Sequence, residues 1–278
     1  MIVVIGDLVA DLIVLGGAAL ERGTDNPAEV RLTRGGSAAN VAAAAAPRHP
    51  SRFIGCVGDD TLGHALVSEL EAADVDVRVQ RAGRTGSIVV LVDTAGERTM
   101  ITDRGAAAEL GPVDPAWMAG AEWVHLPLYG FASARSRDAV TDAATRAAAR
   151  GARVSLDLSS VATLRDLGRA ELQRILAELR PDVVFANEDE ARLTAELHVE
   201  PAGVYVVKRG AHPVLVRVDG QTHAVAVERA EDVLDSTGAG DAFAAGYIVA
   251  ALGGADACES ARAGSELAMS ALRRPGAL

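Results

Sequence analysis

The sequence has 278 residues, 49% of them hydrophobic, which is enough for the core of one large α/β domain or two small ones. A formal net charge of −11, with no Lys/Arg-rich block, argues against nucleic acid and anionic membranes as partners. Cys56 and Cys258 stand far apart and match no metal-binding or redox spacing. Because the sequence also shows neither a signal peptide nor a bilayer-spanning apolar run, we expect a reduced, cytoplasmic protein.

An aspartate follows the first predicted strand. Residues 2–5 form a short apolar run ended by Gly6-Asp7, and Asp11 lies where the chain enters a second apolar run, 12–15. The Asp11 carboxylate could accept hydrogen bonds from substrate hydroxyls. Alternatively, it is a solvated residue at a strand end.

A glycine pair precedes the first predicted helix. Residues 29–33 alternate polar and apolar, as a half-exposed strand does, and Gly35-Gly36-Ser37-Ala38-Ala39-Asn40 leads into an alanine helix that Pro47 stops. The glycines let a ligand approach the backbone, and the Asn40 carboxamide offers a donor and an acceptor to a diol. Close helix packing through small residues explains the alanines, but it explains Asn40 less well.

Residues 86–92 and 98–102 predict two strands joined by a short turn. A hairpin in the middle of an α/β chain needs a surface to pack on. With the strands near residues 12 and 30, it can make a small sheet that projects from the main domain. Arg98, in the second strand, could approach the substrate or could be a solvated surface residue. Tyr129, in a later loop, could lie against a ring of the substrate.

Beyond residue 136 the pattern alternates between helices and short apolar strands. We expect helices over 137–150 and 164–179, and strands over 154–158 and 182–186. Short apolar strands separated by helices predict a parallel sheet covered on both faces. Such sheets bind ligands at the carboxyl ends of their strands.

Polar residues stand at two later strand ends. Asn187 and Glu190 are about one helical turn apart, so they could orient the water shell of a Mg²⁺ ion. As part of an acidic run that opens a helix, they could equally form a capping arrangement. The strand over 204–207 ends at Lys208, the one lysine in the sequence, whose ammonium could meet the phosphates of a nucleotide.

The segment Asp235-Ser236-Thr237-Gly238-Ala239-Gly240-Asp241-Ala242-Phe243 joins an apolar run to a predicted helix over 242–252. Its glycines leave the backbone uncovered, so successive amides at the helix start can point at one anion, and phosphate is the expected ligand. Asp241 would repel a phosphate, but it suits a general base beside an acceptor alcohol. The alternative is that Asp241 is a helix N-cap and the glycines only make a turn.

Three motifs together resemble a known family. D-S-T-G-A-G-D-A-F is similar to the C-terminal signature of the PfkB/ribokinase family of sugar and nucleoside kinases, and G-G-S-A-A-N and N-x-x-E are similar to its other signatures. The resemblance implies a single domain, 1–278, with a three-layer αβα ribokinase-like fold. A mostly parallel central sheet would carry a small β-sheet lid, contributed by about 12–33 and 86–102. The lid would exclude water, and since such lids often pair two subunits, we expect a homodimer.

The resemblance also implies an activity and the roles of single residues. The activity is ATP-dependent transfer of a phosphoryl group to a hydroxymethyl group of a sugar or sugar derivative, with Asp241 as general base. The amides of Gly238, Ala239 and Gly240 would neutralise the developing charge. The residues expected to bind the acceptor are Asp11, Gly35, Gly36, Asn40, Arg98 and Tyr129. Those expected to bind ATP are Asn187, Lys208, Gly210, Thr237, Gly238 and Gly240, with Asn187 and Glu190 holding Mg²⁺ through water.

Some positions depart from the family pattern. Ribokinases usually carry a Lys where this sequence has Ser37, and a sugar-binding Glu where it has Leu128 or Tyr129, so the acceptor pocket is expected to be more apolar than in a ribokinase. Asp235 matches part of a monovalent-cation (K⁺) site. The family chain usually continues past the Gly-Ala near its end, whereas this sequence stops there, so we expect that site to lack its final ligands.

Three alternative functions were weighed. A nucleoside kinase of the adenosine or pseudouridine type is favoured by Ser37 and the residues near Tyr129, but disfavoured by an aromatic content of only 3%. A non-catalytic sugar or nucleotide sensor is disfavoured by the intact Asp241. A dinucleotide-binding dehydrogenase is excluded because Gly6-Asp7-Leu8 follows the first strand in place of a G-x-G-x-x-G turn.

Overall fold

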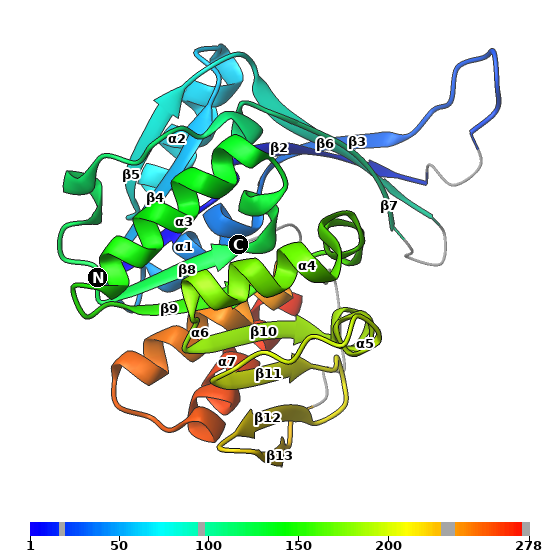
Figure 1. The fold of residues 1–278 in the computed structure, drawn as a ribbon. Helices are drawn as coiled ribbons and strands as arrows, with labels where there is room; N and C mark the ends of the chain where they lie inside the picture. Colours follow the sequence, from blue (N-terminus) through cyan, green and yellow to red (C-terminus); the bar gives the residue numbers. More distant parts are fainter. Residues whose placement is uncertain (17–19, 94–97, 229–236, 274–278) are drawn as a thin grey trace.

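The computed structural model describes residues 1–16, 20–93, 98–228 and 237–273, and within them the chain forms two sheets (Figure 1). The main sheet has nine strands in the order β13-β12-β11-β10-β9-β8-β1-β4-β5, and the second has four in the order β3-β2-β6-β7. The strands of the main sheet are β1 (Ile2–Ile5), β4 (Ser51–Val57), β5 (Asp76–Arg81), β8 (Trp123–Pro127), β9 (Arg153–Asp157), β10 (Val183–Asn187), β11 (Val204–Lys208), β12 (Val214–Val218) and β13 (Gln221–Val225). The second sheet, here called the lid, consists of β2 (Val9–Leu15), β3 (Glu29–Gly35), β6 (Thr85–Val92) and β7 (Arg98–Gly105).

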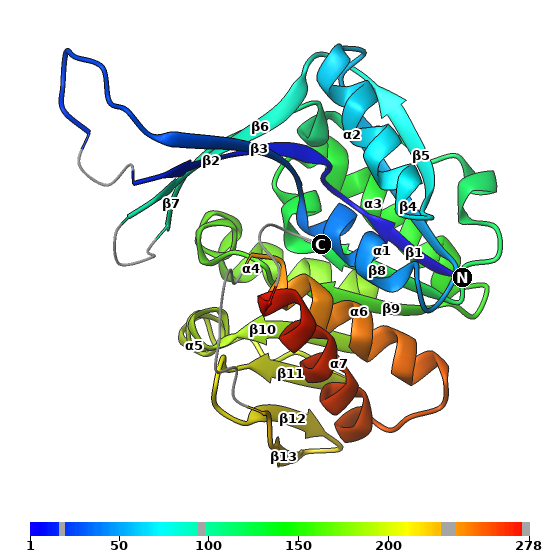
Figure 2. The same ribbon diagram turned by 180° about the vertical axis from the view of Figure 1, so that it is seen from behind.

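Helices cover both faces of the main sheet. They are α1 (Ser37–Ala45), α2 (Thr61–Ala72), α3 (Ala134–Ala148), α4 (Val161–Leu179), α5 (Glu188–Glu196), α6 (Ala239–Leu252) and α7 (Ala257–Leu272), with short 3₁₀ helices at Ala106–Glu109, Pro115–Met118 and Leu128–Phe131. Figure 1 shows α3, α4 and α5 in front of the sheet, and Figure 2, from behind, shows α1, α2, α6 and α7. No helix among the described residues is both long and apolar enough to cross a bilayer.

The central strand β1 explains the layering. Ile2 and Val4 belong to the hydrophobic core under α1, α6 and α7, whereas Val3 and Ile5 belong to the core under α3 and α4. All four side chains are buried because alternate residues of a strand point to opposite faces. β1 pairs in parallel with β4 and β8, and the antiparallel pairings of this sheet are β11 with β12 and β12 with β13, at one edge. The predicted three-layer αβα fold with a mostly parallel sheet is therefore confirmed.

The lid is continuous with the main domain at the site described below. β1 leads into β2 through residues 6–8, and β3 leads into α1 through Gly36. Within the lid, β2 pairs in parallel with β6, while β3 and β7 form its antiparallel edges. The lid projects away from the helical layers (Figure 2).

The start of α6 differs from the prediction. We expected the helix to begin at Ala242, but it begins at Ala239, with Gly238 as N-cap in the left-handed conformation (φ 74°). The Ala242 amide donates to the Gly238 carbonyl at 2.8 Å, so the glycine motif itself forms the first helical turn.

The pair α6 and α7 packs through glycine. A Cβ atom on Gly264 of α7 would lie 2.7 Å from the carbonyl oxygen of Phe243 in α6, and one on Gly246 would lie 2.8 Å from the carbonyl oxygen of Ala263. Because the obstructing atoms belong to the backbone, a side chain at either position would push the helices apart.

We therefore expect Gly264→Leu to lower the free energy of unfolding by about 3 kcal/mol, measured by urea denaturation, since overpacking of a core contact has a cost of this size. Ser270→Leu is the matched control, because Ser270 lies on the exposed side of the same helix and receives the same side chain; its gain in helix propensity is smaller than that at Gly264. Equal stability of the two variants would contradict this account of the packing.

Candidate active site

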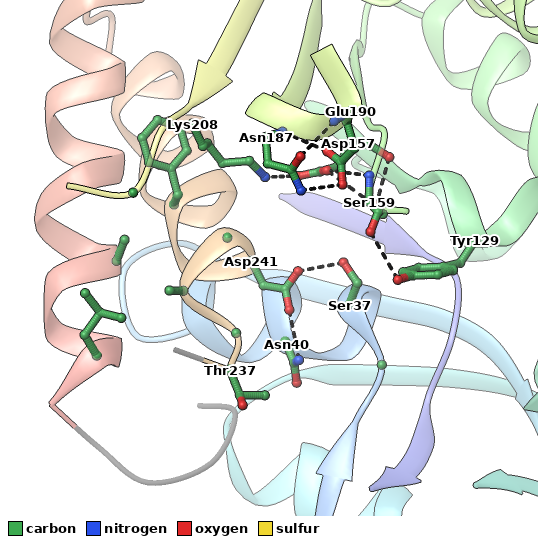
Figure 3. A pocket seen from close by; sticks show the side chains of 18 of the residues that line it. Ser37, Asn40, Tyr129, Asp157, Ser159, Asn187, Glu190, Lys208, Thr237 and Asp241 are labelled. Atoms are coloured by element: carbon green, nitrogen blue, oxygen red, sulfur yellow. Dashed lines mark hydrogen bonds and ion pairs between the residues drawn. The ribbon is translucent and has the colours of Figure 1, made fainter. Parts of the chain in front are cut away.

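A cavity of about 550 Å³ opens at the carboxyl ends of the main-sheet strands, between the lid and the first turn of α6 (Figure 3). Its wall is formed by the lid, the start of α1, the ends of β9, β10 and β11, and parts of α6 and α7. The predicted site residues that line it are Asp11, Gly36, Asn40, Tyr129, Asn187, Glu190, Lys208, Gly210, Thr237, Gly238, Ala239, Gly240 and Asp241.

Asp241 points from α6 toward α1. Ser37 Oγ donates to its Oδ1 at 2.6 Å, and Asn40 Nδ2 donates to its Oδ2 at 2.9 Å (Figure 3). The alternative that Asp241 caps the helix is wrong, because Gly238 holds the N-cap position and has no side chain to satisfy the first-turn amides. Those amides form the positive end of the helix dipole, which favours the binding of an anion.

Two carboxylates, Asp241 and Asp11, line the cavity close enough to interact electrostatically. Burial raises the pKa of Asp241 to about 6, against the hydrogen bonds from Ser37 and Asn40. Burial, then the Asp241 charge, raises the pKa of Asp11 to about 6, and the Arg34 guanidinium opposes this rise. Asp11 Oδ1 is buried without a hydrogen-bond partner among the described residues. An acceptor hydroxyl would supply that missing donor.

The structure shows a steric requirement for glycine at both positions of the pair, and Gly36 lines the cavity. A Cβ atom on Gly35 would lie 2.2 Å from Asp11 Oδ1, and one on Gly36, whose φ is 101°, would lie 2.3 Å from the Asp7 carbonyl oxygen. Gly35 is not among the cavity-lining residues. The first glycine thus makes room for the Asp11 carboxylate, and the second permits the turn from β3 into α1.

Lys208 forms a largely buried ion pair in the wall of the cavity. Its Nζ lies 2.6 Å from Asp157 Oδ2, with 16% and 5% of the two side chains exposed. Burial lowers the pKa of Lys208, but the charges of Asp157 and Glu190 outweigh it and raise that pKa above its ordinary value. A Cβ atom on Gly240 would lie 3.4 Å from Nζ, so the ammonium is beside the first turn of α6.

Asn187 and Glu190 form the predicted capping alternative. The Asn187 side chain accepts from the Glu190 amide at 2.9 Å, and the Glu190 carboxylate accepts from the Asn187 amide and side chain at 2.8 Å each. Glu190 is 2% exposed, and burial, together with the Asp157 charge, raises its pKa. No cluster of three or more His, Cys, Asp or Glu that could hold a metal ion occurs in the described ranges.

The structure brings Asp7, which the sequence did not single out as a site residue, into an ion pair at the cavity. Arg104 donates to both carboxylate oxygens of Asp7, which is 8% exposed, and its guanidinium lies 5.3 Å from the centre of the Tyr129 ring. The Tyr129 hydroxyl donates to the Ser159 carbonyl at 3.1 Å. The one signal for Asp7 was its place directly after the first strand. Arg98 and Asp235 remain predictions, because the Arg98 side chain and all of Asp235 lie outside the described residues.

The chain is similar to known kinases over nearly its whole length. The family model described as pfkB family carbohydrate kinase matches residues 1–278. An ATP-dependent ribose-1-phosphate kinase from Halopiger xanaduensis is 35% identical over 271 residues, covering 89% of this chain and 87% of the relative. A fructokinase from Klebsiella pneumoniae is 32% identical, covering 84% and 82%.

Solved structures share the fold. The crystal structure of adenosine kinase from Sinorhizobium meliloti superposes with a TM-score of 0.86 at 25% identity, covering 99% of this chain and 94% of that one. A sugar kinase from Pyrococcus horikoshii, solved in complex with ATP, gives a TM-score of 0.82 at 23% identity, covering 100% and 94%.

The buried ion pair at Lys208 leads to a stability prediction. We expect Lys208→Met to lower the free energy of unfolding at pH 7 by about 3 kcal/mol, because removing one partner leaves the Asp157 charge buried and unpaired. Arg209→Met is the control: its ion pair with Glu188 has a similar distance, 2.8 Å, but exposed side chains, and should change stability by less than about 1 kcal/mol. Urea denaturation of both variants checks this, and equal effects would refute it.

Proposed function

This chain belongs to the pfkB family of carbohydrate kinases and is an ATP-dependent kinase of a sugar or nucleoside, and we propose that Asp241 is the general base of its reaction. We further propose that the acceptor is a hydroxymethyl group of a sugar or sugar derivative. The observation that carries the proposal is the setting of Asp241: a half-buried carboxylate in the first turn of α6, lining the cavity and oriented by two donors from α1.

The setting of Asp241 suits removal of a proton from an alcohol. Ser37 and Asn40 each occupy one of its oxygens, which fixes the plane of the carboxylate and leaves a further lone pair on each oxygen. A pKa of about 6 leaves most of the carboxylate ionised at pH 7 while keeping it more basic than an ordinary Asp. The hydroxyl proton would pass to Asp241 as the oxygen attacks the γ-phosphorus, while the bond from that phosphorus to the bridging oxygen of the β-phosphate breaks and ADP leaves.

The negative charge on the transferred phosphoryl group would be neutralised by the first turn of α6 and by Lys208. The amides of Gly238, Ala239 and Gly240 are the proposed donors to the phosphoryl oxygens, and the Lys208 ammonium beside Gly240 adds a full charge. Asn187, Gly210 and Thr237 also line the cavity and are proposed to contact ATP.

The residues present fit a magnesium ion. The carboxylate of Glu190 and the carboxamide of Asn187 offer oxygen atoms, and the carboxamide NH₂ donates to the carboxylate. Because Mg²⁺ usually keeps several of its water ligands, these oxygens could hold it through water. Mg²⁺ bound there would neutralise charge on the ATP phosphates. A monovalent-cation site at Asp235 and a cytoplasmic location stay predictions from the sequence.

A nucleoside is the second candidate acceptor. Val9 and Ile88 of the lid, with Met100, give the cavity an apolar wall that a hexose would not need and a base could contact. Asp11, whose Oδ1 lacks a donor, suits the hydroxyls of a sugar and of a ribose equally. Substrate identity therefore has to come from assays.

We expect Asp241→Asn to lower kcat about 100- to 10,000-fold with little change in the KM for ATP, because the base acts only in the transition state. ADP release from Mg-ATP would be measured with pentoses, hexoses, keto-deoxy sugar acids and nucleosides, and the active class names the acceptor. Asp59→Asn, an exposed carboxylate near the start of α2, is the matched control. Wild-type turnover by folded Asp241→Asn would sink the proposed base.

A homodimer through the lid is also proposed. Leu32, Leu12, Val89 and Ile101 pair across the four strands and form one apolar row. Leu32 and Ile101 are 62% and 60% exposed. Their strand neighbours Thr33 and Thr102 point to the other face, where Thr102 lines the cavity, so the apolar row faces away from the substrate. A second copy of the chain would cover this row.

Sedimentation equilibrium should give a dimer for the wild type and a monomer for Leu32→Asp, because a carboxylate in the centre of an apolar interface would be desolvated without a partner. Leu20→Asp is the control, since Leu20 is similarly exposed, at 56%, but lies outside the lid strands. A monomeric wild type, or a dimeric Leu32→Asp, would contradict the proposal.

A further inference from the structure

Arg34, near the end of lid strand β3, is buried beside the proposed base. It is 4% exposed, and its Nη1 donates to Asn40 Oδ1 at 3.0 Å. On its other side, Glu69 Oε1 of α2 lies 3.5 Å from Nε, and that carboxylate is 57% exposed. Arg34 does not line the cavity, so its hydrogen-bonded connection to Asp241 runs through Asn40.

The contact with Arg34 decides which way the Asn40 carboxamide points. A guanidinium can only donate, so Asn40 must present its oxygen to Arg34 and its NH₂ group to Asp241 Oδ2, 2.9 Å away. The reversed carboxamide would place two oxygens against each other at Asp241 and two donors against each other at Arg34. Asn40 is 5% exposed, so water cannot readily replace the lost partner.

We propose that Arg34 is a positioning residue of the phosphoryl transfer, which holds the Asn40 carboxamide in the orientation that donates to the base Asp241. The inference rests on the proposed role of Asp241. Arg34 thereby links three elements: the lid through β3, the helix α1 through Asn40, and the helix α6 through Asp241.

A purely structural role for Arg34 makes a different prediction. As an anchor of β3 to α2 through Glu69, it would affect stability but would not depend on Asn40. A role through Asn40 requires that the two residues act as one unit, so that the effect of losing Arg34 disappears once Asn40 is gone.

A double-mutant cycle of Arg34→Met and Asn40→Ala therefore tests the proposal in steady-state assays with Mg-ATP and the acceptor found in the substrate panel. We expect Arg34→Met to lower kcat roughly tenfold, about the effect of one buried hydrogen bond, with the KM for ATP unchanged. In the Asn40→Ala background the same substitution should change kcat by less than about twofold. Arg34→Lys, which retains a charge and donors, replaces Arg34→Met if the latter does not fold, and its smaller loss should vanish in the same background.

The pH profile supplies a second readout. The other charged groups that face Asp241 are Asp11, Asp157 and Lys208, and all are retained in these variants. Loss of the Arg34 charge, and of the ordered donor it holds, should therefore move the acid limb of kcat to higher pH. Glu69→Gln, which removes the exposed partner of Arg34 but leaves Asn40 in place, should change kcat by less than about twofold and leave the limb where it is.

The outcomes distinguish the role of Arg34 from the role of Asp241. A tenfold loss from Arg34→Met in both backgrounds, or no loss in the wild type, overturns the role of Arg34 and leaves Asp241 as base. Full turnover by Asp241→Asn overturns both. A loss confined to the background that retains Asn40, with a shifted acid limb, supports the positioning role.

Discussion

The site depends on one carboxylate whose surroundings disfavour its charged form. Asp241 is half-buried in the first turn of α6, and its charge is tolerated because two donors on α1, Ser37 and Asn40, meet its two oxygens. That contact requires α1 and α6 to lie side by side over the same face of the sheet, which the alanines of both helices permit. The remaining cost appears as a raised pKa, and a raised pKa is what a base working near neutral pH needs.

The same balance recurs around the cavity. Asp7 forms an ion pair with Arg104, Asp157 forms one with Lys208, and Asp11 lies near Arg34. The charge of each of these three carboxylates is thus offset by a cation from another element. A protein with a formal net charge of −11 has no long-range field to attract ATP. Binding of ATP would therefore have to come from local groups, and those we propose are the amides at the start of α6, the Lys208 ammonium and Mg²⁺.

The sequence predicts what is local in the chain and misses what is distant. Alternating apolar strands and helices indicated the layered sheet, and the glycine spacing indicated the open turn before Asp241. Ser37 was noted only as a departure from the family, because its partner lies 204 residues away. The purpose of Gly35 was also hidden, since only the fold shows that the Asp11 carboxylate fills the space of its missing side chain. Asn187 and Glu190 form a capping box at the start of α5. Their binding of a metal ion stays a prediction.

Lys208 offers a single position for chemical modification of a lysine side chain. Since Lys208 is the one lysine among the 278 residues and it lines the cavity, the ε-amine chemistry of this chain is concentrated in its proposed nucleotide site. Reagents that modify lysine would find a single, shielded target, and ligands that fill the cavity would protect it. The extent of modification at one residue would then report occupancy of the site without any need for turnover.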